Sequence, residues 1–376
     1  MKIGIVVPFS WSYWGGVVEH AENQAAALRA RGHEVKILMG HDPPGALTRF
    51  LHPRSGRHGA LPAEVIPLGR SVVVPANGSL PNIVLSPSSI VRVRDVLRTE
   101  RFDLLHLHEP ATPTICVAAL AFADCATVAT WHAAGSLRWM ALAAPLWGRS
   151  LLDRIDARIA VSRLAAASAG RWLGGDFEIV PNGVVLPPRA DPGGREHRVV
   201  FVGRHDPRKG LHVLLRAWPE IRRRTGARLR LIGTDPLQYR LLHARLRVEE
   251  DGIDVLGIVG SAERDAELAA AKLVVSPALG GESFGMVLAE AFAAATPVVA
   301  SDIPGFADVA DADAAILVPP GDVEALTAAV CELLADEGRR VAMGRAARAL
   351  AGRYSWDAVA ARLDAIYDRV TARAAA

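Results

Sequence analysis

Apolar residues in this chain form short runs separated by longer stretches, in which apolar positions recur every three or four residues. Short apolar runs are typical of strands buried on both faces, and the longer pattern is typical of helices. The first half predicts strands at Lys2–Val7, Val35–Met39, Leu104–Leu107, Thr127–Thr130, Ala157–Val161 and Glu178–Val180. The second half predicts strands at Arg198–Val202, Leu229–Ile232, Asp254–Leu256, Leu273–Ser276, Pro297–Ala300 and Ala315–Val318. Strands that alternate with helices predict an α/β fold with parallel sheets covered on both faces.

Two helices are the clearest of those predicted. The first runs from about Val17 to Arg29, and Gly32 is its C-terminal stop. The last runs from about Trp356 to Arg373. One face of the first helix carries Val17, Ala21, Ala25 and Leu28. This spacing predicts a helix that packs one side against a sheet.

The length of 376 residues predicts two domains, because a single core seldom grows that large. We expect two doubly wound, Rossmann-like domains at residues 1–182 and 197–354. The segment Leu186–Glu196 has the proline, glycine and charge of a linker. Residues 355–376 are expected to form a separate C-terminal helix. In doubly wound sheets ligands bind at the carboxyl ends of the strands, so we expect both domains to face one ligand cleft.

Composition excludes several classes of protein. The 43 basic and 40 acidic residues nearly balance, which argues against a nucleic-acid-binding protein. The cysteines Cys116, Cys125 and Cys331 form no C-x-x-C motif, so they predict neither a metal site nor a disulfide framework, and they favour the cytoplasm. The apolar run in Lys2–Pro8 is too short for a signal peptide, because Pro8 ends it. The run Ala111–Ala123 is too short to span a bilayer.

The segment Pro277–Glu290, PALGGESFGMVLAE, carries the most chemical information. It places Glu282 and Glu290 on either side of a Ser-Phe-Gly turn, between a buried strand and an apolar helix. The first amides of a helix lack partners and attract phosphate, and carboxylates accept hydrogen bonds from hydroxyl groups. Phosphate together with hydroxyls indicates a nucleotide sugar. The alternative for Glu290 is an exposed helical residue, but its apolar neighbours predict a buried helix, where a carboxylate needs a partner or a ligand.

Two cations, Arg204 and Lys209, follow the first strand of the second domain in the sequence GRHDPRKG. At the carboxyl end of a strand they would neutralise the charge on a departing nucleoside diphosphate, as Mg²⁺ does in other enzymes. The alternative is a solvated basic loop. Arg208 is a substitute for either cation and ranks below them.

Two short motifs are weaker evidence. Gly15 and Gly16 lie between the first strand and the first helix, where missing side chains would let backbone amides approach a diphosphate. The alternative is a tight turn, and the absence of G-x-G-x-x-G there argues against a dinucleotide-dependent dehydrogenase. Asp311 and Asp313 form a D-x-D pair, which we interpret as turn chemistry and not as a metal site.

Three histidines lie within or directly after predicted strands. His132 follows a strand and would hydrogen-bond a sugar hydroxyl, although a structural role is the alternative. His106 and His108 alternate along one strand, so they share one face. With no third ligand nearby in the sequence, we expect structural hydrogen bonds from this pair and no metal, with Glu109 at the edge of the cleft.

Together these motifs resemble the retaining glycosyltransferases of family four, and most closely the bacterial phosphatidylinositol mannosyltransferase group. The pattern ESFG-x4-E with GR-x4-KG is specific, and the similarity runs the whole length of the chain. The matching segments are PFSWSYWGGV, DLLHLHEP, ATWH, ARIAVS, EIVPNGV, VGRHDPRKG, LGGESFG, VLAEAFAAATPVVASDIPGF and RYSWDAV. The resemblance implies the GT-B fold, in which the last helix crosses back onto an acceptor-side N-terminal domain and the C-terminal domain binds the nucleotide sugar.

The resemblance also implies roles for individual residues. Glu290 would bind the ribose hydroxyls, Glu282 the hydroxyls of the donor sugar, and His132 the outer hydroxyl of that sugar. The diphosphate and sugar would be surrounded by Gly15, Gly16, Arg204, Lys209, Ser283, Phe284, Gly285, Met286 and Val287. Transfer would retain the anomeric configuration by a same-face mechanism, in which the leaving phosphate deprotonates the acceptor. No metal and no cofactor would be needed beyond the nucleotide sugar as co-substrate.

The acceptor side departs from that group. The group's Tyr-Asn-Gly-Ser loop reads Ala76-Asn77-Gly78-Ser79 here, and Asn82 takes the place of its arginine. Leu137 replaces a lysine and Val18 a glutamine, so the charge-assisted partners of a phosphate are missing. Aromatic residues are frequent on this side instead, where they would contact sugar rings or apolar acceptors or pack in the core. We expect the acceptor side to include Trp11, Tyr13, Asn77 and Glu109.

The sequence therefore predicts a retaining, metal-independent hexosyltransferase, with mannose from GDP-mannose as the first choice of donor. The acceptor is unidentified, and a glycolipid, a glycan precursor or a small-molecule alcohol is expected. The alternatives are a phosphatidylinositol mannosyltransferase proper, a sugar-nucleotide epimerase and a non-catalytic nucleotide-sugar-binding protein. We expect a cytoplasmic protein that makes at most weak peripheral contact with the inner membrane face through Ser136–Ser150, which holds two tryptophans. The oligomeric state and the base of the donor are left open.

Overall fold

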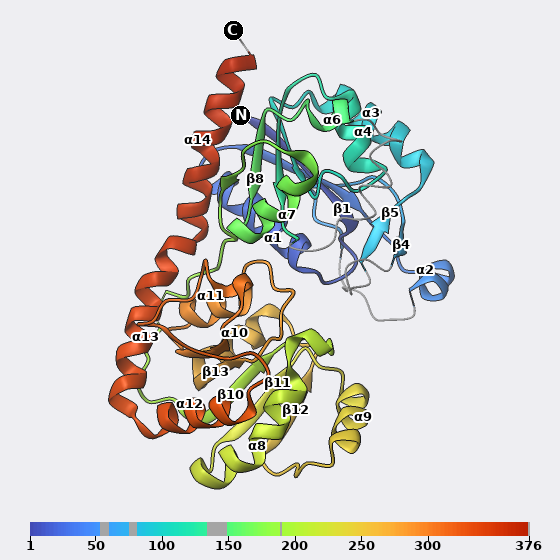
Figure 1. Cartoon of the computed structure of the whole chain (residues 1–376). Helices are drawn as coiled ribbons and strands as arrows, with labels where there is room; N and C mark the ends of the chain where they lie inside the picture. Colours follow the sequence, from blue (N-terminus) through green and yellow to red (C-terminus); the bar gives the residue numbers. More distant parts are fainter. Residues whose placement is uncertain (53–59, 75–80, 134–148, 189, 375–376) are drawn as a thin grey trace. The chain divides into compact units, whose positions relative to one another are not determined.

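The computed structural model describes residues 1–52, 60–74, 81–133, 149–188 and 190–374, which form two compact units. Unit 1 comprises Met1–Gly183 together with Trp356–Ala376, and unit 2 comprises Val184–Ser355. Each unit is a sheet with helices packed on it (Figure 1). The segment predicted as a linker begins inside unit 2, where the Arg348 side chain donates to the carbonyl oxygen of Pro187 at 2.6 Å.

The sheet of unit 1 has the strand order β3-β2-β1-β6-β7-β8-β9, and all of these pairs are parallel. Two short strands lie off this path, because β5 pairs antiparallel with both β1 and β4. The strands are β1 (Lys2–Ser10), β2 (Glu34–Gly40), β3 (Val65–Pro67), β4 (Ser71–Val73), β5 (Asn82–Val84), β6 (Leu104–His108), β7 (Ala126–Trp131), β8 (Ala157–Ala160) and β9 (Glu178–Ile179). The order reverses between β1 and β6, as in doubly wound nucleotide-binding sheets.

The helices of unit 1 connect these strands. They are α1 (Gly16–Ala30), α2 (Ala46–Leu51), α3 (Pro87–Glu100), α4 (Ile115–Phe122), α6 (Arg149–Leu152), α7 (Arg163–Leu173) and α14 (Trp356–Ala374). Helix α1 ends as predicted, because Gly32 has a positive φ of 92° and its amide donates to Arg29. Helix α14 belongs to unit 1, where Val359, Leu363 and Val370 join the buried core with α1.

Unit 2 has a six-stranded parallel sheet of order β12-β11-β10-β13-β14-β15. The strands are β10 (Glu196–Val202), β11 (Arg228–Ile232), β12 (Ile253–Gly257), β13 (Ala271–Ser276), β14 (Val298–Ser301) and β15 (Ala315–Val318). The helices are α8 (Leu211–Thr225), α9 (Pro236–Leu246), α10 (Ser261–Ala270), α11 (Met286–Ala293), α12 (Val323–Ala335) and α13 (Glu337–Ala351), with 3-10 turns η1 (Pro207–Lys209), η2 (Pro304–Phe306) and η3 (Gly352–Tyr354). The order again reverses next to the first strand of the unit, between β10 and β13.

The prediction of two parallel-sheet α/β domains is confirmed, and each of the twelve predicted strands is present. The three-residue strands β3, β4 and β5 were not predicted. The expectation that Pro8 ends the first strand is wrong, because β1 continues to Ser10 through a shift of register after Val6. Phe9 pairs there with Ile83 of β5, which gives the last residues of β1 an antiparallel partner. A proline is tolerated where such an irregularity interrupts the ladder.

Candidate active site

Two loops of unit 2 meet at the carboxyl ends of β10 and β13. Gly210 has φ of +71°, and a Cβ atom at this position would lie 1.8 Å from the carbonyl oxygen of Pro277. The amide of Leu279 donates to the carbonyl oxygen of Arg208 at 2.7 Å. Only glycine fits this contact, because it has no Cβ and adopts positive φ without strain. The loop after β10 is therefore held against the loop that precedes α11.

This contact brings together two of the predicted site residues. Lys209 Nζ lies 2.5 Å from Glu282 Oε1, and the side chains are 26% and 16% exposed. Gly305 packs behind Glu282, since a Cβ there would lie 1.9 Å from the carbonyl oxygen of Glu282. A partly buried, charge-assisted hydrogen bond of this length orients both groups. The structure thus places one predicted cation and one predicted carboxylate in direct contact.

The other two cations of this loop have different surroundings. Arg208 donates to both carboxylate oxygens of Asp206, at 2.6 to 3.1 Å. The Arg208 side chain lowers the pKa of Asp206, and that carboxylate in turn raises the pKa of Arg208. Arg204 is exposed and contributes a smaller lowering of the Asp206 pKa. Because Asp206 engages Arg208, Arg204 is the more available partner for an anion.

Helix α11 begins directly after this loop. Gly285 precedes its first turn with φ of +89°, and a Cβ there would lie 2.8 Å from the ring of Phe306. The amides of Met286 and Val287 are in the first turn of the helix, where the helix itself supplies no acceptor. Phe284 is buried and meets the ring of Tyr354 edge-on at 5.7 Å, whereas Ser283 is half-buried. Backbone amides in this position attract phosphate oxygens.

Glu290 lies one turn further along α11. The residues on either side of it are buried, so the prediction of a buried helix is confirmed. The Glu290 side chain is 14% exposed, and its Oε1 lies 3.3 Å from Nη1 of Arg264 on α10. The ion pair compensates the cost of a charge in these surroundings. The ribose role of Glu290 stays a prediction.

In unit 1, Gly15 and Gly16 form the start of α1. Both are exposed, and a Cβ atom on Gly16 would meet nothing within 4 Å. Gly15 has an extended φ of −168°, which any residue adopts. Neither the backbone conformation nor the packing of the described residues therefore requires glycine at these two positions.

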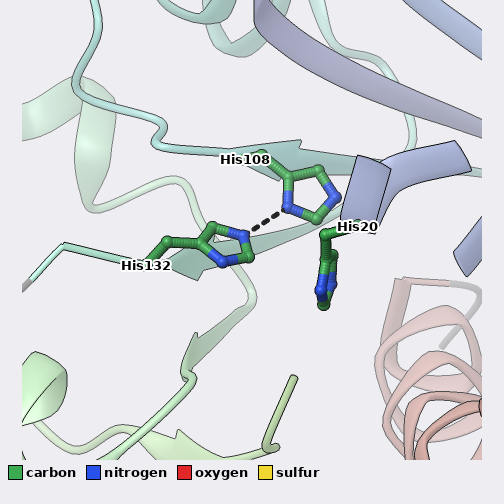
Figure 2. Close-up of side chains that lie close together, drawn as sticks. All are labelled: His20, His108 and His132. Atoms are coloured by element: carbon green, nitrogen blue, oxygen red, sulfur yellow. Dashed lines mark hydrogen bonds between the residues drawn. The ribbon is translucent and has the colours of Figure 1, made fainter. Parts of the chain in front are cut away.

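His132 directly follows β7, and its ring lies among other imidazoles (Figure 2). Its Nε2 is 2.8 Å from Nδ1 of His108, and its ring centroid is 4.8 Å from that of His20. Burial lowers the pKa of His132 to about 4, and a hydrogen bond between its ring and the Asn182 side chain partly opposes that shift. The expectation that no third imidazole lies near His108 is wrong, because α1 and the end of β7 supply His20 and His132. The spacing of His20, His108 and His132 along the sequence did not indicate that their rings lie together.

His106 has the structural role expected from the sequence. Its ring stacks on that of His108 at 4.8 Å, which confirms that the two share one face of β6. Nδ1 lies 2.5 Å from the hydroxyl of Tyr367 on α14, and Nε2 lies 2.7 Å from the hydroxyl of Thr130 on β7. Burial lowers the pKa of His106 to about 3, so the ring is neutral near pH 7. These bonds attach α14 to the sheet of unit 1.

Glu109 holds the segment that carries His132. Its Oε1 accepts hydrogen bonds from the amides of His132 and Ala133, at 2.9 and 3.0 Å. Burial raises the pKa of Glu109, and these two bonds oppose that shift. Glu109 itself has a positive φ of 50°, which is uncommon for a residue other than glycine. The carboxylate therefore shapes the loop after β7, in addition to any contact with an acceptor.

The remaining predicted residues are less informative. Trp11 is 7% exposed and belongs to the core of unit 1, so little of its ring is accessible. The ring of Tyr13 lies 4.7 Å from that of His52, tilted by 36°, and burial raises the pKa of the Tyr13 hydroxyl to about 12. Asn77, Leu137 and most of Ser136–Ser150 lie outside the described residues. The D-x-D prediction is confirmed as turn chemistry, because Oδ1 of Asp311 accepts from the amide of Asp313 at 3.0 Å.

No helix among the described residues is both long and apolar enough to cross a membrane.

Two family models match the chain: "Glycosyltransferase Family 4" covers residues 14–186, and "Glycosyl transferases group 1" covers residues 196–336. Their boundary falls close to the division between the two sheets.

Similar proteins agree with these matches. A phosphatidyl-myo-inositol mannosyltransferase of Mycolicibacterium smegmatis is 36% identical over 99% of this chain and 94% of its own length. One of Mycobacterium leprae is 36% identical over 98% of this chain and 97% of its own length. A sucrose-phosphate synthase structure from Thermosynechococcus elongatus has a TM-score of 0.75 at 20% identity, with 99% of this chain and 100% of that chain covered. The chain therefore belongs to family four of the glycosyltransferases and has the GT-B fold of two Rossmann-like sheets.

Proposed function

We propose that this glycosyltransferase is a retaining, metal-independent hexosyltransferase, with mannose from GDP-mannose as the first donor to test. The observation that carries the proposal is the pair of Lys209 and Glu282, held at 2.5 Å beside the first turn of α11. A cation next to amide donors suits a diphosphate, and an adjacent carboxylate suits sugar hydroxyls. The full-length similarity to mannosyltransferases supports mannose as the sugar.

In the proposed donor complex, Arg204 and Lys209 bind the diphosphate together with the amides of Gly285, Met286 and Val287. Glu282 accepts hydrogen bonds from the sugar, and Glu290 from the ribose. Gly15 and Gly16 of unit 1 let the backbone approach the diphosphate, and His132 contacts the outer hydroxyl of the sugar. These assignments follow the family pattern, and the positions of the residues within each unit are compatible with them.

The proposed reaction takes place on one face of the sugar. The bond between the anomeric carbon and the phosphate oxygen breaks, and a bond from that carbon to the acceptor oxygen forms on the same face. The departing phosphate takes the proton of the acceptor hydroxyl, so no protein nucleophile is required. Arg204 and Lys209 stabilise the negative charge that develops on the diphosphate, which is the largest contribution expected from the protein. No divalent ion takes part in this scheme.

The acceptor is proposed to be an alcohol on a glycolipid, a glycan precursor or a small molecule. Phosphatidylinositol is the second candidate, because the mannosyltransferase relatives are named for it. Val18, where that group has a glutamine, is 2% exposed and packs in the core of unit 1, so it offers no polar contact to an inositol phosphate.

A thermal-shift panel of GDP- and UDP-sugars tests the donor. A ligand at 100 times its dissociation constant adds about 2.7 kcal/mol to the free energy of unfolding. We expect GDP-mannose to stabilise the protein most. The preferred donor is then incubated with acceptors that include phosphatidylinositol, and the anomeric configuration of the product is read by proton NMR. An inverted product contradicts the retaining mechanism. Conversion of the donor into another nucleotide sugar without any acceptor indicates an epimerase.

A further inference from the structure

Three imidazoles of unit 1 come from three separate elements and converge on one point (Figure 2). His20 lies on α1, His108 is the last residue of β6, and His132 follows β7. Each ring offers one nitrogen, and these three nitrogens lie within 4.8 Å of one another. Nδ1 of His108 lies 2.8 Å from Nε2 of His132. All three residues belong to the same unit, so their arrangement depends on one fold alone.

The nitrogens of this group are not saturated by hydrogen bonds. Nε2 of His108 and Nδ1 of His20 are buried, and neither has a hydrogen-bond partner among the described residues. A buried polar atom without a partner costs about 1–3 kcal/mol, so two in one cluster need an explanation. His106 stacks on His108 but differs, because the hydroxyls of Tyr367 and Thr130 engage both of its nitrogens. Among these four rings, the unsatisfied nitrogens therefore belong to His20 and His108, two of the three rings that converge.

The rings are also in the protonation state that a metal requires. Burial lowers the pKa of His20 and of His108 well below the ordinary value, and the neighbouring imidazoles lower both further. Neutral imidazole keeps a lone pair on one nitrogen, and this is the form that binds metal ions. The Glu109 carboxylate fixes the backbone of His132, and Asn182 contacts its ring. A side-chain hydrogen bond to the ring, as between Asn182 and His132, commonly supports a ligating histidine.

We infer that His20, His108 and His132 form a binding site for one late first-row divalent transition-metal ion, such as Zn²⁺, Co²⁺ or Ni²⁺. Three imidazoles match the preference of these ions and not that of Mg²⁺ or Ca²⁺, which take oxygen ligands. Zinc–nitrogen bonds of about 2.0–2.1 Å place the nitrogens of a tetrahedral site about 3.4 Å apart. A pair at the upper limit of 4.8 Å therefore has to close by about 1.4 Å, and the nitrogens of His108 and His132 that lie 2.8 Å apart have to separate. A fourth position is left for water or another ligand.

Occupancy of this site has a consequence for catalysis, which rests on the proposed function. There, His132 contacts the outer hydroxyl of the donor sugar. A metal ion would take a nitrogen of this ring and fix its orientation, so the ion would inhibit transfer while serving no step of it. The reaction would then need no added divalent ion and would be slowed by zinc.

The test titrates Co²⁺ into the untagged, chelator-treated full chain and follows the visible absorption that tetrahedral cobalt acquires on binding nitrogen ligands. Zn²⁺ is then added to displace it. We expect one equivalent of cobalt to bind, and His20→Asn and His108→Asn each to weaken binding by at least about tenfold. Two controls should bind like the wild type: His106→Asn, in which a ring with engaged nitrogens is removed, and His197→Asn, in which an exposed ring is removed. Circular dichroism of the metal-free variants checks that each one folds.

Failure of cobalt to bind the wild type overturns the inference, as does equal binding by folded His20→Asn and His108→Asn variants. Transfer measured with and without stoichiometric Zn²⁺ separates this inference from the proposed function. Binding with inhibition supports both. Metal binding without inhibition of transfer supports the metal site and contradicts the proposed contact between His132 and the donor sugar. Normal transfer in a protein that binds no metal leaves the proposed function intact and ends the inference.

Discussion

Replacing Lys209 by methionine removes the cation nearest to Glu282 and keeps most of the length of the side chain. In the wild type, Nζ lies 2.5 Å from Oε1 of Glu282, and the two side chains are 26% and 16% exposed. If Lys209 stabilises charge on the leaving diphosphate, its loss raises the barrier of the chemical step. Removing one preorganised donor of this kind lowers kcat by about 10²–10³, or about 2.7–4 kcal/mol.

The same substitution should affect folding much less. The pair is only partly buried, so its loss should cost about 1–2 kcal/mol, between the values for exposed and fully buried pairs. For a domain of this size the melting temperature then falls by about 2–4 °C for each kcal/mol. A folded variant with a small thermal shift and a large kinetic defect is therefore the expected result.

The assay measures kcat/KM for transfer from the preferred donor, together with the melting temperature. Lys272→Met is the matched control, because Lys272 is a half-buried lysine of the same unit near the amino end of β13. It should keep the wild-type rate. A folded Lys209→Met variant within about twofold of wild-type kcat/KM would refute the role of this cation, because a preorganised donor should contribute far more.

Three further predictions concern other residues. Gly16→Ala should fold at least as stably as the wild type, because its Cβ meets nothing within 4 Å and alanine is the better helix residue. The variant should nevertheless bind the donor more weakly in calorimetry. An unchanged affinity would contradict a contact between this turn and the diphosphate. Gly210→Ala should lower the midpoint of urea unfolding of unit 2 more than Gly226→Ala does. Both glycines have positive φ, but only at Gly210 would a Cβ lie 1.8 Å from the carbonyl oxygen of Pro277. An equal decrease of the midpoint in both variants would mean that the backbone relaxes this clash at no cost. The buried histidines should make unit 1 less stable as the pH falls below about 6.5. His106 and His132 have pKa values of about 3 and about 4 in the folded protein, so below pH 6.5 the unfolded chain binds protons that the folded chain does not. A urea midpoint that rises with acidity contradicts that sign, and His106→Asn should flatten the slope.

The fold could be predicted from the sequence because its signals are local. Runs such as Leu273–Ser276 are apolar at every position, and a strand buried on both faces needs no other information. Strands β3 to β5 have three residues each, too few for a period to show. The extension of β1 through Pro8 depends on a partner strand that lies about seventy residues away in the chain, so local pattern pointed the wrong way.

The candidate site could be predicted only in part. Lys209 and Glu282 stood out because each follows a strand, but their contact depends on how closely Gly210 approaches Pro277. His20 carried no signal, since a single histidine in an amphipathic helix usually has no special role. Its position beside His108 and His132 results from the packing of α1 on the sheet of unit 1, which sequence spacing does not encode.

Transfer measured in excess EDTA tests the central proposal most directly. Protein freed of divalent ions is given the preferred donor and acceptor, with and without added Mg²⁺. The account predicts full turnover in EDTA, because Arg204, Lys209 and the amides at the start of α11 stabilise the leaving diphosphate. Activity that disappears in EDTA and returns only with Mg²⁺ would contradict it.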